Sequence, residues 1–482
     1  MGSGTTQSFR ECSPIKLFRD SSKEPERDQL YLLPPSVRDW LPENHDVWFY
    51  LDAMDELDLS SIYEAYADLG QPPYSPKMMV TVWAYAYASG IRSSRKVEKA
   101  LHESVPFRVL AGNLHPDHWT LNNFRKRHEG ALKDLFLQTV RLARKSGAIG
   151  GKHVAVDGTK LQGNASKRKA MSYDRMQKEE KRLKEEIDRF FDEADAIDAE
   201  EDRTIGPGRG DELPKHLMTQ KKRLEAIREA KKALEEEARQ KKQEEQDERK
   251  RVAEQEGREF HPRTNPEEAT PNPKAQRNFT DPESRIMKGS GQNFIQGYNG
   301  QAAVDSKNQI IVAADLTNQA VDNPHLPGLI DQTVQNLGDH PREASADAGY
   351  YSENNLAHLV QIGIEAYIPP SKVKHSEFRN AVSPRGRIPK DLSPADRMRR
   401  KLKTKKGREH YALRMKTVEP VFGQMKGARG LIRLARRGLE AARSCWFFEC
   451  AVHNLAKLCR LAAAARAATT SCRKVAAGAG WR

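Results

Sequence analysis

A long charged stretch interrupts this chain, and any fold must keep most of it outside the core. It covers residues 165–290 and interleaves Lys with Glu. Its apolar residues recur at helical intervals in two runs. The first run has intervals of 4, 3, 4 and 3 and consists of Leu183, Ile187, Phe190, Ala194 and Ile197. The second has intervals of 7, 3 and 7 and consists of Leu217, Leu224, Ile227 and Leu234. This spacing predicts two antiparallel helices over residues 166–257 that pack like a coiled coil. A turn-rich break at 203–214 separates them, and 261–278 is predicted to be a linker.

The patterns on either side of this stretch predict a mixed α/β domain. One strand precedes it at 153–156. Further strands are predicted at 294–305, 309–317, 343–350 and 364–370, with helices at 325–338, 352–363 and 410–464. Successive strands followed by alternating helices and strands are typical of a mixed sheet with helices on its faces. The charged hairpin is then an insertion between the first and second strands.

The remaining segments complete the predicted organisation. Helical spacing at 75–91, 93–104 and 119–147 predicts an all-α N-terminal domain. The five predicted parts are an irregular arm at 1–45, the helical domain at 46–148, the α/β domain at 149–164 and 291–464, the hairpin and linker at 165–290, and a basic Ala-rich tail at 465–482.

The charge balance narrows the choice of partner. Lys and Arg total 81 and Asp and Glu total 67, which gives a formal net charge of +14. This excess favours a polyanion, above all nucleic acid, over a basic surface that is only solvated. The five cysteines form no CxxC pair, so neither a disulfide framework nor a zinc site is indicated, and a reducing cytoplasm fits. No uninterrupted apolar run of ~18 residues is present, so no membrane span is predicted.

Two apolar strands end in an acid that glycine soon follows. The segments are "VAVDG" at Asp157 and "ASADAG" at Asp347. A lone Asp before Gly is usually a turn residue, but strand ends are where sites form in such sheets. Two neighbouring carboxylates repel, and one of them would protonate unless a cation lay between them. A Mg²⁺ or Mn²⁺ ion takes oxygen ligands, so it would offset the cost of burying both carboxylates.

A third acid is expected on a neighbouring element. The segment "TVEPVFG" supplies Glu419 and places it among apolar residues. Lys426 lies two helical turns further along the same face, where a base could hold a phosphate close to the ions. Three other acids are rivals for this site: Asp305, which precedes a hairpin turn, Asp315, and Asp322, which could lie near the site.

Four segments carry a resemblance to a known family. They are "VAVDGTK", "GYNGQAAVD", "SADAGYYSENN" and "YALRMKTVEPVFGQMKGARG", preceded by "SPKMMVTVWAYAY" and "HPDHWTLNNFRKRH". In this order they resemble the DDE transposases of bacterial insertion sequences, in particular the 1182-type group, which is related to the four/five-type transposases. One departure is that four residues separate Arg414 from Glu419 where the family pattern has three, so Lys416 could replace Arg414. The spacing of Glu419 and Lys426 fits the pattern.

The resemblance implies both a fold and an activity. The fold is RNase H-like, and the metal-binding triad is Asp157, Asp347 and Glu419, which would hold two Mg²⁺ or Mn²⁺ ions with Asp157 bridging both. The activity is cleavage at transposon ends and joining of those ends to target duplex DNA. The protein would act as a homodimer on DNA, in the bacterial cytoplasm at the nucleoid. Two alternatives stay open: a catalytically inactive transposase that only binds DNA, and a nuclease of the same fold.

Basic residues outside the triad predict contacts with DNA. The helix at 119–147 is predicted to bury Trp119 and to expose a phosphate-contacting patch that includes His128. Residues 397–408 hold eight basic residues and no acid, and predict further phosphate contacts. The predicted DNA-binding residues are Arg125, Lys126 and Arg127 in the patch, Tyr411, Arg414 and Lys426 by the resemblance, and Arg433, Arg436 and Arg437 beyond them.

Overall fold

The computed structural model describes residues 36–66, 73–166, 169–204, 215–262, 264–289, 293–372, 382–386, 389 and 391–478. Most of the predicted N-terminal arm, residues 205–214 of the predicted break and the end of the basic tail lie outside the described residues. So do the side chains of Phe190, Ala194, Ile197 and Leu217. Within the described ranges, none of the helices has the length and apolar character needed to cross a bilayer.

The N-terminal region is helical, as predicted. Its elements are η1 (Val37–Trp40), α1 (Asp46–Asp55), α2 (Ser60–Tyr63), α3 (Pro76–Ala88), α4 (Ser94–Glu103), α5 (Val105–Leu110), α6 (His118–Arg127) and α7 (Glu129–Lys145). Helix α3 begins with Pro76 at a position that needs no amide donor, and it ends before Gly90, whose φ of 77° favours glycine. Trp83 of α3 is fully buried at the centre of the core of this region.

The predicted exposure of α6 is wrong at three positions. Trp119 is 68% exposed, whereas Arg125 is 7% and His128 is 3% exposed. Arg125 is buried because its guanidinium stacks on the Trp83 ring at 3.8 Å and donates to the Tyr87 hydroxyl at 3.1 Å. The single helix predicted at 119–147 also divides into α6 and α7 at His128.

A six-stranded mixed sheet forms the centre of the second region. Its strands are β1 (His153–Gln162), β4 (Arg285–Lys288), β5 (Phe294–Asp305), β6 (Ile311–Thr317), β7 (Glu343–Ala346) and β8 (Glu365–Tyr367), in the order β4-β5-β1-β7-β8 with β6 also paired to β5. Strand β1 is antiparallel to β5 and parallel to β7, which is parallel to β8. The prediction of a mixed α/β fold behind a helical N-terminal region is confirmed. Strand β4 lies within the stretch predicted to be insertion and linker, and it joins the sheet because Met287 is buried there.

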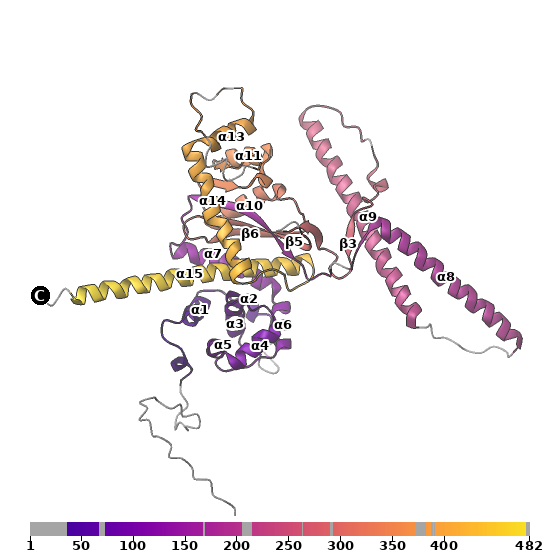
Figure 1. The fold of residues 1–482 in the computed structure, drawn as a ribbon, viewed down its shortest axis with the longest axis horizontal. Helices are drawn as coiled ribbons and strands as arrows, with labels where there is room; N and C mark the ends of the chain where they lie inside the picture. Colours follow the sequence, from indigo (N-terminus) through magenta and orange to yellow (C-terminus); the bar gives the residue numbers. More distant parts are fainter. Residues whose placement is uncertain are drawn as a thin grey trace, which may run out of the picture.

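Helices cover both faces of this sheet (Figure 1). On one face lie α10 (Leu326–Leu337) and α11 (Glu353–Gln361), joined to the strands by the short helices η5 (Asn323–His325) and η6 (Ala348–Tyr350). On the other lie α14 (Lys405–Gly423), the π-helix η7 (Gln424–Ala428), α15 (Leu439–Gly478) and α7. Helix α13 (Pro394–Lys403) packs on α14. Helix α15 also contributes Phe448 and Val452 to the N-terminal core, so it joins the two regions.

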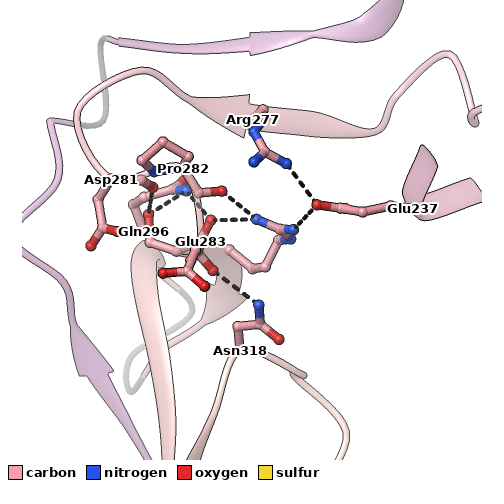
Figure 2. Close-up of polar contacts among 9 residues, drawn as sticks. Glu237, Arg277, Asp281, Pro282, Glu283, Gln296 and Asn318 are labelled. Carbon is pink, nitrogen blue, oxygen red and sulfur yellow. Dashed lines mark hydrogen bonds and ion pairs between the residues drawn. The ribbon is translucent and has the colours of Figure 1, made fainter. Parts of the chain in front are cut away.

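The charged stretch forms an arm that projects from the sheet (Figure 1). It contains β2 (Ala170–Ser172), α8 (Tyr173–Thr204), α9 (Lys215–Gln255), η3 (Pro266–Glu268) and β3 (Gln276–Asn278). The two long helices are antiparallel: Glu186 of α8 bonds Gln220, near the start of α9, whereas Tyr173 bonds Glu235 further along it. The base of the arm is tied to the sheet by Glu237, which pairs with Arg277 of β3 at 2.6 Å and with Arg285 of β4 at 2.7 Å (Figure 2).

Candidate active site

Strand register brings the two predicted aspartates together. The last parallel pair between β1 and β7 is Val156 with Ala346, so the next residues along the chain are Asp157 and Asp347. The strand predicted to end at Val156 continues to Gln162, so Asp157 lies within β1, whereas Asp347 directly follows β7. Because both strands run in the same direction, the two aspartates lie together where this pairing ends. Two acids that are far apart in the sequence therefore become neighbours.

Asp157 is the more enclosed of these two aspartates. Its side chain is 18% exposed, and it accepts from the Gly158 amide at 2.9 Å and from Arg414 Nη1 at 2.9 Å. Burial raises its pKa to about 6, Arg414 opposes this, and Asp347 raises the pKa further. A carboxylate held in this way would gain from a nearby cation. Asp347 caps η6 by accepting from the Gly349 amide at 2.8 Å through one oxygen.

Arg414 of α14 joins two of the predicted ligands. Its Nη1 contacts Asp157, and its Nη2 donates to Glu419 Oε1 at 3.1 Å. The unusual sequence spacing therefore does not prevent Arg414 from reaching the acids, and Lys416 is exposed. Glu419 itself is 42% exposed rather than enclosed by apolar residues, because its neighbour Val418 is on the buried face of α14.

The donor set fits divalent ions in part. In the ranges that the structure describes, no three His, Cys, Asp or Glu side chains lie close enough to hold one ion. Asp157 and Asp347 are adjacent and offer the oxygen ligands that Mg²⁺ prefers. Glu419 reaches Asp157 only through the guanidinium of Arg414, so that guanidinium must move before all three acids can share ions.

Two further residues of the predicted motif lie beside the acids. Lys426 in η7 donates from Nζ to the Lys160 carbonyl of β1 at 2.8 Å. Burial lowers its pKa, Lys160 lowers it further, and Asp157 opposes both. Tyr411 is half-buried on α14, and burial raises its pKa against the opposing effect of Arg414.

Asp322, a rival in the sequence, forms a second polar layer beside these acids. Its Oδ1 accepts from Lys160 Nζ at 2.9 Å, from Asn299 Nδ2 at 2.7 Å and from Gln301 Nε2 at 2.8 Å. A Cβ at Gly158 would lie 2.6 Å from this oxygen, so only glycine fits there.

The same layer extends to Asp347. A Cβ at Gly349 would lie 3.0 Å from Asp347 Oδ1 and 3.6 Å from Asp322 Oδ2, so the two carboxylates flank this glycine. The Tyr350 hydroxyl donates to Gln301. Sequence reasoning did not single out Lys160, Asn299, Gln301 or Tyr350. The available signal was the pair of polar residues two apart, Asn299 and Gln301, near the middle of a predicted strand.

The other rival acids have local structural roles. Asp305 accepts from three backbone amides, those of Gly150 at 3.0 Å, Gly151 at 2.8 Å and Lys307 at 2.9 Å. It is fully buried and closes the turn after β5. Asp315 forms an ion pair with Arg443 at 3.2 Å.

The predicted arginines beyond Lys426 pack around the end of β1. Arg433 and Arg437 are exposed residues that donate to the backbone of Gly163 at 3.2 Å and of Asn164 at 3.0 Å, respectively. Arg436 pairs with Glu129 and is mostly covered. In the N-terminal patch, Lys126 is exposed. Arg127 is also exposed and lies over the Tyr66 ring at 4.7 Å.

Comparison with known proteins matches two parts of the chain. Residues 35–127 match the family model described as a transposase domain (DUF772), and residues 386–459 match the model described as a transposase DDE domain. The second match contains Arg414, Glu419 and Lys426, whereas Asp157 and Asp347 lie outside it. No curated protein and no solved structure matches the chain. The two matches, one on the helical N-terminal region and one on the C-terminal part of the α/β region, support an insertion-sequence DDE transposase.

Proposed function

We propose that this protein binds the ends of an insertion sequence and catalyses DNA cleavage and strand transfer by two-metal-ion phosphoryl transfer. One observation supports this above all: Asp157 and Asp347 meet where the parallel pairing of β1 and β7 ends, and Arg414 joins Asp157 to Glu419. We assign the sheet to the RNase H-like fold, with the α8–α9 hairpin as an insertion after its first strand.

In this proposal, Asp157, Asp347 and Glu419 would hold two Mg²⁺ or Mn²⁺ ions. Bound there, such ions would supply activation of a water or a DNA 3′-hydroxyl and stabilisation of the leaving oxygen. In cleavage, a water oxygen bonds to phosphorus as the bond to the DNA 3′-oxygen breaks. In strand transfer, the freed 3′-hydroxyl attacks a target phosphodiester in the same way.

The basic side chains of the site position the DNA. Lys426 uses one of its three donors on the Lys160 carbonyl, which leaves donors for a phosphate next to the acids. Arg414 partly neutralises the acids in the absence of substrate and then contacts a phosphate together with Tyr411. Exposed Arg433 and Arg437, with the basic stretch 397–408, contact the flanking backbone.

The parts of the chain divide the work. The helices of 46–148 recognise the ends, and residues 149–164 with 291–464 carry out the chemistry. The arm within 165–290 contacts a second subunit, so that a homodimer holds both ends. The protein acts on chromosomal DNA in the bacterial cytoplasm, at the nucleoid.

The test is incubation of the purified protein with duplexes copied from the DNA that flanks its own gene, with and without Mg²⁺. We expect Mg²⁺-dependent cuts and joined products. Asp157→Ala, Asp347→Ala and Glu419→Ala should each abolish cleavage while leaving end binding and folding nearly intact. Asp315→Ala is the matched control, because this acid lies outside the site and should leave cleavage unchanged. A triad variant that cleaves near the wild-type rate would refute the assignment.

The same experiment separates the two alternatives. A wild-type protein that binds the ends but never cuts them is a DNA-binding descendant of a transposase. A protein that cuts but yields no joined product is a nuclease of this fold. Cleavage together with joined products leaves only the transposase.

A further inference from the structure

Helix α6 has two sharply different faces. One face carries Leu121, Phe124 and Arg125, which are buried. The opposite face carries Trp119, Asn122 and Lys126, spaced at three and four residues so that they lie in one row. Asn122 and Lys126 are exposed, and Trp119 is 68% exposed. A large aromatic side chain left in solvent beside an amide and an ammonium group suggests a surface that a partner covers.

The buried side of α6 holds this row rigidly. Asp117 caps the helix by accepting from the Thr120 amide at 2.7 Å, and His118 contacts Glu98 of α4 at 3.0 Å. Arg125 donates to the Arg92 carbonyl at 3.1 Å and stacks on Trp83. The helix is therefore fixed at both ends, and Asn122 Oδ1 also accepts from Arg125 Nη2 at 3.4 Å, so the row is held in place before a partner binds. Such preorganisation lowers the entropy cost of binding.

The charge around α6 identifies the partner as a polyanion. Residues 91–128 contain eight Lys or Arg against three acids. Arg95, Lys96 and Lys99 of α4, the helix packed on α6, are exposed. The Asn amide pairs with adenine and the Lys ammonium with guanine in the major groove of duplex DNA, and apolar side chains there contact thymine methyl groups. A helix fits that groove, whereas a protein partner would not need this excess of positive charge.

We infer that α6 enters the major groove of the end DNA and reads its sequence with Trp119, Asn122 and Lys126. This inference rests on the proposed function and specifies how the ends are recognised. Lys126 belongs to the basic patch predicted from the sequence. The new element is that the row containing it reads bases, and that Trp119 is part of the reading surface.

The connection to the active site sets the distance to the cut. Arg436 donates to the Arg125 carbonyl at the end of α6 at 3.3 Å. Two residues earlier, the Leu434 amide donates to the Gln162 carbonyl at 2.8 Å, which extends the sheet at the end of β1. From Gln162 to Asp157 the strand covers about 17 Å. The bases read by α6 therefore lie within roughly one helical turn, about 10 base pairs, of the phosphate at the acids.

The test compares the full-length protein with the variants Trp119→Ala, Asn122→Ala, Lys126→Ala and the triple variant. Binding is measured by fluorescence anisotropy, on duplexes copied from the flanks of the gene and on shuffled duplexes of equal length. We expect the triple variant to lose at least tenfold in affinity for the flank duplexes and less than about threefold for the shuffled ones. Base changes that weaken wild-type binding should leave triple-variant binding unaffected, and should lie within about 10 base pairs of the cut.

Matched controls come from the same helical region. Tyr63→Ala removes another exposed aromatic residue, and Lys145→Ala removes another exposed Lys, which lies on α7 and pairs with Glu56. Both should keep the wild-type preference. Equal losses on both duplexes would overturn base reading in favour of phosphate contacts. A changed oligomeric state with unchanged DNA preference would overturn it in favour of an interface between copies.

Failure of this inference differs from failure of the proposed function. A wild-type protein that prefers and cuts the flank duplexes, with a triple variant that does the same, refutes only the role of α6. A wild-type protein that neither prefers nor cuts them refutes both. All three side chains are exposed, so we expect each variant to fold. Circular dichroism of each variant tests this and separates unfolding from a loss of DNA contacts.

Discussion

Two of the arginine–carboxylate networks among the described residues differ in their environment. In the first, Arg92 pairs with Glu449 of α15, with side chains 13% and 2% exposed. In the second, Arg414 pairs with Asp157 and with Glu419, which is 42% exposed. The first network links the helical region to α15, and the second lies where the parallel pairing of β1 with β7 ends.

The difference between them is the balance of charge. Glu449 interacts with two arginines, Arg92 and Arg429. Arg92 also holds Arg429 in place, because its Nη1 donates to the Arg429 carbonyl. Arg429 in turn contacts His453 Nδ1 at 2.7 Å. Burial raises the pKa of Glu449, and Arg92 and Arg429 oppose that rise. The acid is thus matched by base, and the network is complete without a ligand.

Where the pairing of β1 with β7 ends, acids exceed bases. Among the described residues, Arg414 is the guanidinium that contacts both Asp157 and Glu419, and Asp347 adds a third carboxylate in register. Such an excess of negative charge destabilises the folded chain unless a cation binds. The comparison teaches that a buried ion pair indicates structure when it is balanced, and a binding site when carboxylates remain in excess.

The largest expected effect breaks the first network. Glu449→Ala leaves Arg92 and Arg429 without their acid in the interior, so we expect a loss of about 3–5 kcal/mol in the free energy of unfolding. Glu419→Ala leaves Arg414 paired with Asp157 and should change this free energy by less than about 0.5 kcal/mol. Urea unfolding followed by circular dichroism measures both. Glu449→Gln, which keeps hydrogen-bonding atoms, should recover part of the loss. An equal loss of unfolding free energy in Glu449→Ala and Glu419→Ala would show that the two networks do not differ in their contribution to stability.

The next effect concerns Asp322, which has features of both networks. Its Oδ1 accepts from Lys160, Asn299 and Gln301, and its Oδ2 faces Gly349 beside Asp347. Asp322→Asn weakens a charge-assisted contact between half-buried groups, so we expect a loss of about 2 kcal/mol in stability.

Cleavage should separate Asp322 from the triad. We expect Asp322→Asn to keep cleavage to within about tenfold, because the residue supports the layer beneath the acids. Asp347→Asn should lose cleavage without losing stability. The reverse result for Asp322, a stable protein that cannot cut, would make it a metal ligand and change the assignment of the site.

Sequence reasoning succeeded where local pattern and sheet geometry decide the outcome. Asp157 and Asp347 could be paired because each follows an apolar stretch in one of two neighbouring parallel strands, although β1 does not end at Asp157 and continues to Gln162. It failed where long-range contacts decide. Arg125 is buried because Trp83, from a separate helix, offers its ring. Trp119 is exposed because it lies about 200° around the helix from Leu121, so the two cannot share a buried face.

Long-range contacts also decide the environment of the other site residues. Glu419 was expected among apolar neighbours, but in α14 those neighbours turn to the opposite face and leave it 42% exposed. The Asp322 carboxylate accepts hydrogen bonds from three side chains that lie on β1 and β5. These donors are distant in the sequence, so the residues around Asp322 do not predict the contacts. Of the apolar residues that the 3–4 spacing picked out in the arm, Leu183, Leu224 and Ile227 are buried in one cluster. The contacts of Glu237 at the base of the arm join residues far apart in the sequence, so no local pattern predicts them.

A smaller effect tests whether Arg414 occupies the place of a cation. If it does, Arg414→Gln removes a charge that a metal ion must displace, and Mn²⁺ binding to the free protein should tighten about tenfold, or about 1.4 kcal/mol. Isothermal titration calorimetry measures this without activity. Arg399→Gln, which removes a surface partner of Asp396, is the control and should leave Mn²⁺ affinity unchanged. An unchanged affinity in Arg414→Gln would show that the guanidinium and the ion do not compete.

The smallest effect extends the comparison to an exposed pair. Glu365 of β8 contacts Lys401 at 3.0 Å and Lys406 at 3.1 Å, and its side chain is 41% exposed. Burial raises the pKa of Glu365, but the two lysines outweigh burial and lower it to about 2. Because this folded value lies below the unfolded one, the carboxylate stabilises the fold above about pH 4.3, and this contribution is lost as pH falls towards 2. Solvent screening reduces the contribution to about 1 kcal/mol.

The free energy of urea unfolding of Glu365→Gln should therefore differ from that of the wild type by this amount near neutral pH and converge with it in acid. Glu353→Gln, an exposed control on α11, should follow wild type throughout, and a gap for Glu365→Gln that persists unchanged in acid would assign the loss to packing instead of charge.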